Sequence, residues 1–502
     1  MRGWPRALLL DGVIVVAWLL SVGMVLVHER GQLLGGLSNP TATLSATIEA
    51  KEQWFGLYYQ GQKIGFSKTA LTPLERGGVP GVGITDYGRI FFSLLGSPQQ
   101  LEVDAQAFID ADWRLQTFSA SIKSATYNLK WTGRRHGDEL LVTVEAPGSA
   151  FTKRLTDPTG SAFVNGLSSW AAFHRLRVGQ SGKAWVLNPL ALNPEAVYFS
   201  VPRREMLDGR EALVVETDVG GMATTSWVTP EGEVLKEVSP LGWELRQESM
   251  AQALKGLSAQ APTTDLLAAT SVPVDQPLEN PEGIAQLVLL VEGERSMIQT
   301  PWQTILPSER LAEYQRAPPQ GAWCLIQLRR PTLSEATPAV PETVKRYQRP
   351  SPFVQSDDPR LIAKAKEVVG GETDPWKQVA LLNHWVFSTV TKRLTIGLPS
   401  AVDVLITPVG DCHEHTVFFT ALARSLGIPT RMIAGLVYQH GRLFYHAWPE
   451  VWVGEWIPID PTLGQPLADV THLGLIEAEN ENLIALGQFV GKLRVHVLSV
   501  VR

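Results

Sequence analysis

The sequence has little cysteine and no excess of basic charge. Of its 502 residues two are cysteines, Cys324 and Cys412, and two cysteines provide no disulfide framework. Lys and Arg form no cluster, aromatic residues are not interleaved with basic ones, and the net charge is −6. Because chains that bind nucleic acid carry basic patches, we do not expect nucleic acid as a partner.

Internal repeats and long low-complexity tracts are absent as well. The length exceeds that of one ordinary hydrophobic core and predicts two or three domains. Changes in composition along the chain predict the following order: a transmembrane anchor over 1–30, a tether over 31–50, a β-rich domain over 51–255, a linker over 256–282, a β lead-in over 283–348, a second domain over 349–485 and a C-terminal strand over 486–502.

The longest apolar run lies near the N-terminus, from Ala7 to Val27, and only Asp11 interrupts it. As a helix with a rise of about 1.5 Å per residue it reaches about 31 Å, which matches a hydrocarbon core of about 30 Å. Arg2 and Arg6 precede it, which favours a cytoplasmic N-terminus. We therefore predict a single-pass anchor in the cytoplasmic (inner) membrane with the bulk of the chain periplasmic; a cleaved signal peptide is the alternative.

Short alternating stretches separated by Gly, Asp and Pro follow, which predicts an antiparallel β-rich domain over 51–255. Trp54–Tyr59 and Lys63–Phe66 flank the turn residues 60–62 as a hairpin would. Phe163–Phe173 is the one fair helical interruption. The sequence leaves open whether this domain binds or positions a partner or is a structural spacer.

The last third of the chain carries helix signals. Asp358-Pro359 and Asp374-Pro375 each place a capping acid before a proline at the first helical position. Cys412 opens an apolar-periodic stretch that ends at Gly427, which predicts a helix with Cys412 in its first turn. Unpaired N–H groups and the helix dipole at that end favour a thiolate, so we expect the pKa of Cys412 to lie below about 8.5. Cys324, within an apolar run, is expected to be an inert strand residue.

Three strands are predicted after that helix. Thr430–Tyr438 and Leu443–Val453 flank a turn, and Trp456–Asp460 follows a second turn. Asp460 ends the third strand, where it could lie beside His446 of the second.

Cys412, His446 and Asp460 therefore supply a thiol, an imidazole and a carboxylate in the order that a cysteine acyl-transfer triad needs. The thiolate attacks an amide carbonyl, the imidazole moves the proton, and the carboxylate orients the imidazole. Cys412, His413 and His415 could instead bind a metal, but no second cysteine pair exists, so we expect neither metal nor cofactor. His413 and His415 are expected on the helix or in its core, and His440 and His472 in surface loops.

These motifs resemble the transglutaminase-like superfamily of papain-type fold, whose pattern is a Gly-x-Cys helix, a His-Ala-Trp strand and an Asp-Pro strand. The resemblance covers roughly 357–475 and implies that Cys412 is the nucleophile, His446 the base, Asp460 its orienting partner and Trp448 a wall of the acyl site. Pro449 departs from the pattern, because proline lacks a backbone donor, and implies a bulge or an edge position.

We therefore predict an α+β protein with an N-terminal transmembrane helix, an antiparallel β-rich domain and a transglutaminase-like α+β domain. The expected function is that of a cysteine peptidase or amidase, or of a protein-glutamine acyltransferase, acting on a protein or peptide through a thioester, with hydrolysis favoured over cross-linking. The alternative is a non-catalytic envelope binding or assembly module. The sequence does not give the oligomeric state.

Overall fold

The structure is a computed structural model of the whole chain, and it forms two compact units. One contains the described residues up to 265 and the other those from 270 onward. The structure describes residues 50–502 apart from the following gaps: 95–96, 112–113, 125–127, 147–148, 157–175, 189–192, 220–221, 231, 240–241, 258–264, 266–269, 334–339, 394–399, 478–485 and 487.

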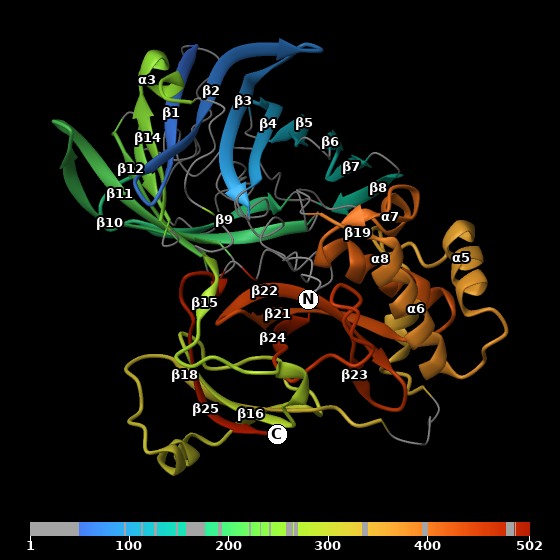
Figure 1. Cartoon of the computed structure of the whole chain (residues 1–502). Coiled ribbons are helices and arrows are strands. Elements are labelled where there is room, and N and C mark those ends of the chain that lie inside the picture. Colours follow the sequence, from blue (N-terminus) through green and yellow to red (C-terminus); the bar gives the residue numbers. More distant parts are fainter. Residues whose placement is uncertain are drawn as a thin grey trace. The chain divides into compact units, whose positions relative to one another are not determined.

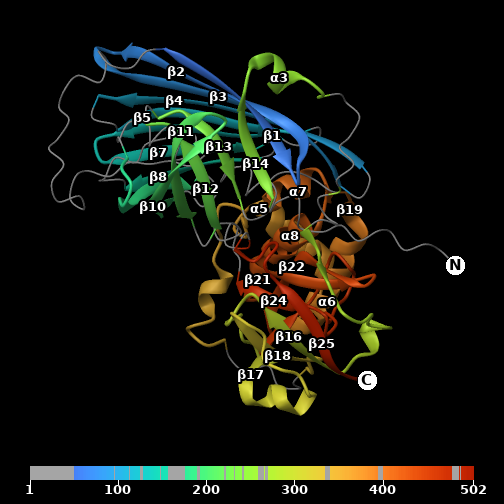
Figure 2. The ribbon, with the colours of Figure 1, turned by 90° about the vertical axis from the view of Figure 1, so that its left-hand side faces the viewer.

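The first unit is one curved antiparallel sheet of 14 strands, in the order β8-β7-β6-β5-β4-β3-β2-β1-β14-β13-β12-β11-β10-β9 (Figure 1, Figure 2). Neighbours in sequence pair from β1 to β8 and from β9 to β14, and β1 pairs with β14, which joins these two halves of the sheet. The strands are β1 Lys51–Tyr59, β2 Gln62–Arg76, β3 Val79–Leu94, β4 Ser97–Asp110, β5 Leu115–Lys123, β6 Asn128–His136, β7 Glu139–Ala146, β8 Ser149–Thr156, β9 Ser181–Asn188, β10 Asn193–Leu207, β11 Arg210–Val219, β12 Met222–Val228, β13 Val234–Val238 and β14 Trp243–Glu248.

Alternation of buried and exposed side chains builds this sheet. Along β6 the buried positions are every second residue, including Leu129 and Trp131, so one face of the strand packs on the core. The predicted hairpin is confirmed, since β1 and β2 pair around the Gln60-Gly61 turn. A short helix, α3 Met250–Leu254, follows the last strand. The predicted helix at 163–173 lies outside the described residues.

The second unit holds a five-stranded sheet with helices grouped beside β21 and β22 (Figure 1). Its strands are β15 Val272–Pro273, β22 Arg442–Trp452, β21 Thr430–Gln439, β24 Leu473–Glu477 and β23 Trp456–Pro458, which pairs with β22. The α-helices are α5 Pro359–Val369, α6 Pro375–Thr389, α7 Ala401–Ile406 and α8 Cys412–Ser425; a two-stranded pair, β19 Thr391–Lys392 and β20 Val409–Gly410, precedes α8, and 3₁₀ turns occur at Pro281–Gly283, Ser308–Tyr314 and Lys345–Gln348.

The helix starts follow the sequence signals. The side chains of Asp358 and Asp374 cap α5 and α6 by accepting hydrogen bonds from backbone N–H groups of the first turn. Helix α8 is buried along nearly its whole length and packs against α5, α6, α7 and the β21–β22 pair. A helix surrounded on all sides holds its first residue, Cys412, in a fixed place.

The C-terminal strand belongs to a second sheet of this unit. In that sheet β16 Gln286–Glu292 pairs with β18 Trp323–Arg329, as the sequence suggested, and also with β25 Arg494–Val501. β17 Gln303–Leu306 completes the order β17-β18-β16-β25. Strands from the start and the end of the unit thus share one sheet.

Pro449 does not interrupt β22, and the bulge expected there is wrong. The β21–β22 ladder runs in register from Thr430 to Gln439, with Pro449 opposite Met432. The Pro449 carbonyl accepts a hydrogen bond from the Ile459 N–H, so the nitrogen of the same residue also faces away from β21. Proline therefore removes no donor from the ladder with β21.

The predicted α+β class is wrong. The structure is mostly β, with 51% of residues in strands and 18% in helices. Short sequence windows underestimated the strands: β3 runs for 16 residues and keeps several glycines within it. The predicted transmembrane helix is not supported either. Residues 7–27 lie outside the described residues, and no helix among the described ones is long and apolar enough to cross a membrane.

Candidate active site

The N-terminus of α8 holds Cys412 in a closed hydrogen-bonded turn. The Asp411 side chain accepts from the His413 N–H at 3.0 Å, and the Glu414 carboxylate accepts from the Asp411 N–H at 2.8 Å. A β-carbon at Gly410 would lie 2.3 Å from the Glu414 side chain. Only glycine leaves room for this capping carboxylate, so the turn before Cys412 depends on residue 410.

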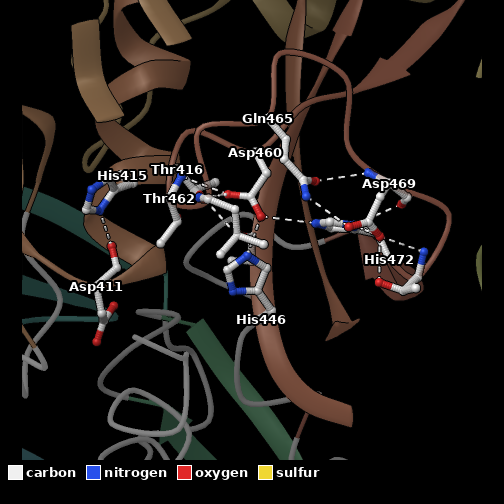
Figure 3. A network of polar contacts seen from close by, with 12 residues as sticks. Asp411, His415, Thr416, His446, Asp460, Thr462, Gln465, Asp469 and His472 are labelled. Carbon is white, nitrogen blue, oxygen red and sulfur yellow. Dashed lines mark hydrogen bonds and ion pairs between the residues drawn. The ribbon is translucent and has the colours of Figure 1, made fainter. Parts of the chain in front are cut away.

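His446 and Asp460 meet in the interior. His446 lies in β22, and Asp460 follows β23, the strand that pairs with the end of β22. Nε2 of His446 is 2.7 Å from Oδ2 of Asp460 (Figure 3). The backbone N–H groups of Thr462 and Leu463 donate to Oδ1 at 2.7 and 2.9 Å. The carboxylate is therefore fixed by its own turn and aimed at the imidazole.

Cys412 reaches the same place through Ala447, the residue after His446. The Ala447 N–H donates a hydrogen bond to the Cys412 sulfur, and the Ala447 carbonyl accepts from the Thr416 hydroxyl at 3.0 Å. Nδ1 of His446 is buried and has no hydrogen-bond partner among the residues that the structure describes. The three residues that the sequence singled out thus come together, with one imidazole nitrogen bound to the carboxylate and the other unpartnered.

The ionisation expected for Cys412 is not what the structure favours. Complete burial raises the pKa of the Cys412 thiol well above its usual range, and the Asp411 charge raises it further. Glu414 and Asp460 act in the same direction, while the Ala447 N–H lowers the pKa. The negative charges of Asp411 and Glu414, which cap the helix N-terminus, therefore offset the stabilisation of the thiolate that the helix dipole would provide. Cys324 is buried in β18, and burial raises its pKa to about 12.

Trp448 is completely buried next to the imidazoles. Its ring stacks on His446 with centroids 6.2 Å apart and meets His472 edge-on at 5.0 Å. A β-carbon at Gly435, opposite His446 on β21, would lie 2.8 Å from this indole. Trp448 therefore packs the triad from the sheet side, and its role as a wall of an acyl site stays a prediction.

His472 is the residue that sequence reasoning missed. It was expected in a surface loop, but it is completely buried, and its Nε2 lies 3.0 Å from Oδ2 of Asp460. Figure 3 shows Asp460 between His446 and His472. No motif marks His472; only the turn from Asp460 back to β24 brings it there.

Among the described residues, His446, Asp460 and His472 form a group whose ligand atoms lie within 4.8 Å of one another. The distance of 2.7 Å between His446 Nε2 and Asp460 Oδ2 is that of a charge-assisted hydrogen bond. It is shorter than the spacing of about 3.3 Å between two atoms that a tetrahedral ion binds at about 2 Å each. We therefore assign hydrogen bonds to this cluster. His415, part of the metal alternative in the sequence, directs Nδ1 at the Asp411 carbonyl, 2.6 Å away.

Comparison with known proteins agrees with this geometry. Residues 362–461 match the model of the Transglutaminase-like superfamily. An uncharacterized protein of Haemophilus influenzae is 31% identical over 100 residues, which cover 18% of this chain and 26% of that protein. The chain thus spans about a quarter of the length of this curated relative.

Solved structures show weaker similarity. A candidate cysteine protease from Cytophaga hutchinsonii shares 18% identity over 42% of this chain and 82% of its own, with a TM-score of 0.29. A β-barrel-like protein of unknown function from Brucella abortus shares 9% identity over 40% of this chain and 95% of its own, also with a TM-score of 0.29. The sequence match and the local geometry together support one conclusion: residues 362–461 of this chain form a transglutaminase-like domain.

Proposed function

We propose that the protein is a cysteine acyl-transfer enzyme that acts on amide bonds of a protein or peptide through a thioester at Cys412. The orientation of His446 carries this proposal. Nε2 is bound to Asp460, and the buried Nδ1 has no hydrogen-bond partner in the described part of the chain. The next residue, Ala447, donates its N–H to the Cys412 sulfur. The thiol requires an imidazole that donates one N–H to a carboxylate and keeps a free lone pair on its other nitrogen to accept the thiol proton.

The reaction then follows from these positions. The Cys412 proton moves to Nδ1 of His446 while the sulfur forms a bond to the amide carbonyl carbon. The C–N bond breaks, and the imidazolium returns the proton to the leaving amine, which leaves a thioester. Asp460 stabilises the imidazolium that exists between these two steps.

The acceptor decides between two activities. Water, deprotonated by His446, would cleave the thioester and complete a hydrolysis; an amine would complete a cross-link. We propose hydrolysis, and this choice rests on the resemblance to the superfamily alone. Incubation with casein peptides and a primary amine separates the two, because hydrolysis yields cleaved or deamidated peptides and transfer yields amine adducts by mass spectrometry.

The enzyme proposal is tested by alkylating the full chain with iodoacetamide over a range of pH and mapping both cysteines by mass spectrometry. Cys412 should react faster than Cys324, because a neighbouring base takes its proton. His446→Ala should move the Cys412 reaction to higher pH, and Asp460→Asn with a peptide substrate should accumulate acyl-Cys412. Equal, slow reaction of both cysteines would refute the enzyme proposal.

One observation favours the alternative of a non-catalytic module. Cys412, His446 and Asp460 are each completely buried, and burial disfavours the thiolate. An idle triad would then be part of a packed core that serves a binding surface. The alkylation experiment decides between the two functions, since an idle buried thiol reacts only when the protein unfolds.

A further inference from the structure

Each ring nitrogen of His472 faces an oxygen atom that can accept a hydrogen bond. Nε2 faces Oδ2 of Asp460 at 3.0 Å, and Nδ1 faces the Asp469 carbonyl at 3.0 Å and Oδ1 of Asp469 at 3.5 Å. A neutral imidazole carries one N–H and can satisfy only one such acceptor. Two acceptors, one on each side, require both nitrogens to be protonated, so the geometry assigns a positive charge to His472.

Both neighbouring carboxylates are held in the ionised, accepting state. Asp460 receives two backbone N–H groups on one oxygen and two imidazoles on the other. Asp469 accepts from the Thr471 N–H and hydroxyl and from the Gln465 amide. Buried charges of this kind persist only when they are paired and hydrogen-bonded.

A second sheet fixes the position of His472. The Gln303 side chain, in β17, accepts from the Gly474 N–H and donates to the Gly474 carbonyl, both at 2.8 Å. This pairing anchors β24 two residues after His472. Trp448 closes the other side with its ring 5.0 Å from that of His472. The ring is therefore clamped and cannot turn away from Asp460.

We propose that His472 is a positioning residue of the site: its fixed imidazolium keeps Asp460 ionised and aligned on His446. This inference rests on the acyl-transfer function proposed above. The contacts of His472 are with Asp460, Asp469, His446 and Trp448, so it acts through Asp460 and not on Cys412 directly.

Charge balance gives the proposal a measurable consequence. Asp460 and Asp469 bring two negative charges into the interior, and His472 cancels one. The remaining negative charge matches the one positive charge that His446 gains when it takes the thiol proton. The titratable and charged groups that face this cluster or Cys412 are Asp411, Glu414, His415, Lys392, His446, Asp460 and Asp469. Loss of the His472 charge raises the proton affinity of every group near it.

The first test is the pH profile of Cys412 alkylation by iodoacetamide in the full chain. His472→Gln should move each midpoint of the profile to higher pH by about one unit, since the His472 ring centre is 6.0 Å from that of His446. His496→Gln is the matched control. His496 also lies between two carboxylates, Asp275 and Glu292, but in β25, and its loss should leave the midpoints unchanged.

A purely structural role would lower the amplitude of the profile at unchanged midpoints, and that result would overturn the inference. A shift to lower pH would overturn it too. A parent Cys412 that reacts no faster than Cys324 refutes the proposed function, and the positioning role falls with it. A reactive parent with unmoved midpoints in His472→Gln refutes only the role of His472.

A second measurement uses the parent protein and does not depend on whether a variant of His472 folds. In protein labelled with ¹⁵N-histidine, a ring with both nitrogens protonated should persist at about pH 8.5, where an ordinary histidine with a pKa of about 6.5 is neutral. The signal should remain in His496→Gln. Its absence from the parent protein would overturn the inference.

Discussion

At the scale of single residues, the site depends on two residues outside the proposed triad, Gly410 and His472. Gly410 leaves space for the Glu414 carboxylate, which caps the turn before Cys412. His472 supplies a charge that the sequence motifs do not predict. Both act through a neighbour: the glycine through a helix cap and the histidine through Asp460.

Gly410→Ala should lower the free energy of unfolding by about 1–3 kcal/mol, because its β-carbon would displace the Glu414 side chain from 2.3 Å away. Cys412 alkylation should slow as the capping turn shifts. The control is Gly371→Ala, where a β-carbon meets nothing within 4 Å and stability should barely change. Urea unfolding measures both, and equal stability of the two variants would contradict the capping argument.

The pH dependence of stability should carry the signature of His472. Burial alone lowers its pKa, but hydrogen bonds to Asp460 and Asp469 raise the pKa of His472 to about 10. A folded-state pKa above the unfolded value of about 6.5 gives stability that is complete below pH 6.5 and is lost as the pH rises toward 10. Urea midpoints at pH 6.5 and 10 should therefore differ more in the parent than in His472→Gln. The same difference in both proteins would show that His472 is not charged.

At the scale of elements, the β21–β22–β24 ladder sets the distances within the site. Gly435 of β21 faces His446 on one side and Gly474 on the other. A β-carbon there would lie 2.2 Å from the Leu473 carbonyl oxygen. The strand that carries His446 and the segment that carries His472 can approach only because residue 435 has no side chain.

Two substitutions on this ladder should lower the free energy of unfolding by different amounts. Pro449→Ala should reduce stability by about 1 kcal/mol or less, because proline mainly restricts the unfolded chain and its nitrogen faces away from β21. Gly435→Ala should cost more, about 1–3 kcal/mol, and should slow Cys412 alkylation by moving Trp448. Thermal melting and alkylation of both variants provide the test. A larger loss for Pro449→Ala would mean that the fixed φ of proline is itself required.

At the scale of the whole molecule, segments far apart in the sequence build the second unit together. β16, β18 and β25 come from both ends of the unit and form one sheet. Gln303, in β17 of that sheet, hydrogen-bonds to Gly474 in β24 of the other. The helix–strand core that carries the motifs is thus tied to strands outside the family match.

Gln303→Leu should leave the Gly474 N–H and carbonyl without partners and cost about 1–3 kcal/mol for the buried groups. The pH midpoints of Cys412 alkylation should also shift, because β24 then holds His472 less firmly. Gln320→Leu, at an exposed position outside β17, is the control and should change neither. Unfolding by urea and the alkylation profile are the measurements; unchanged stability and unchanged midpoints in Gln303→Leu would refute the link between the sheets.

The sequence by itself determined the local features. Asp358, Asp374 and Cys412 mark helix starts because caps act within one turn. The order of thiol, imidazole and carboxylate predicted the triad because a motif records which residue types the chemistry needs.

Only the tertiary structure decided the rest. The ring of His472, the burial that raises the pKa of Cys412, and the pairing of β25 with β16 depend on residues far apart in the chain. Burial and charge are set by every neighbour in space, and no local pattern records which distant segment will supply them.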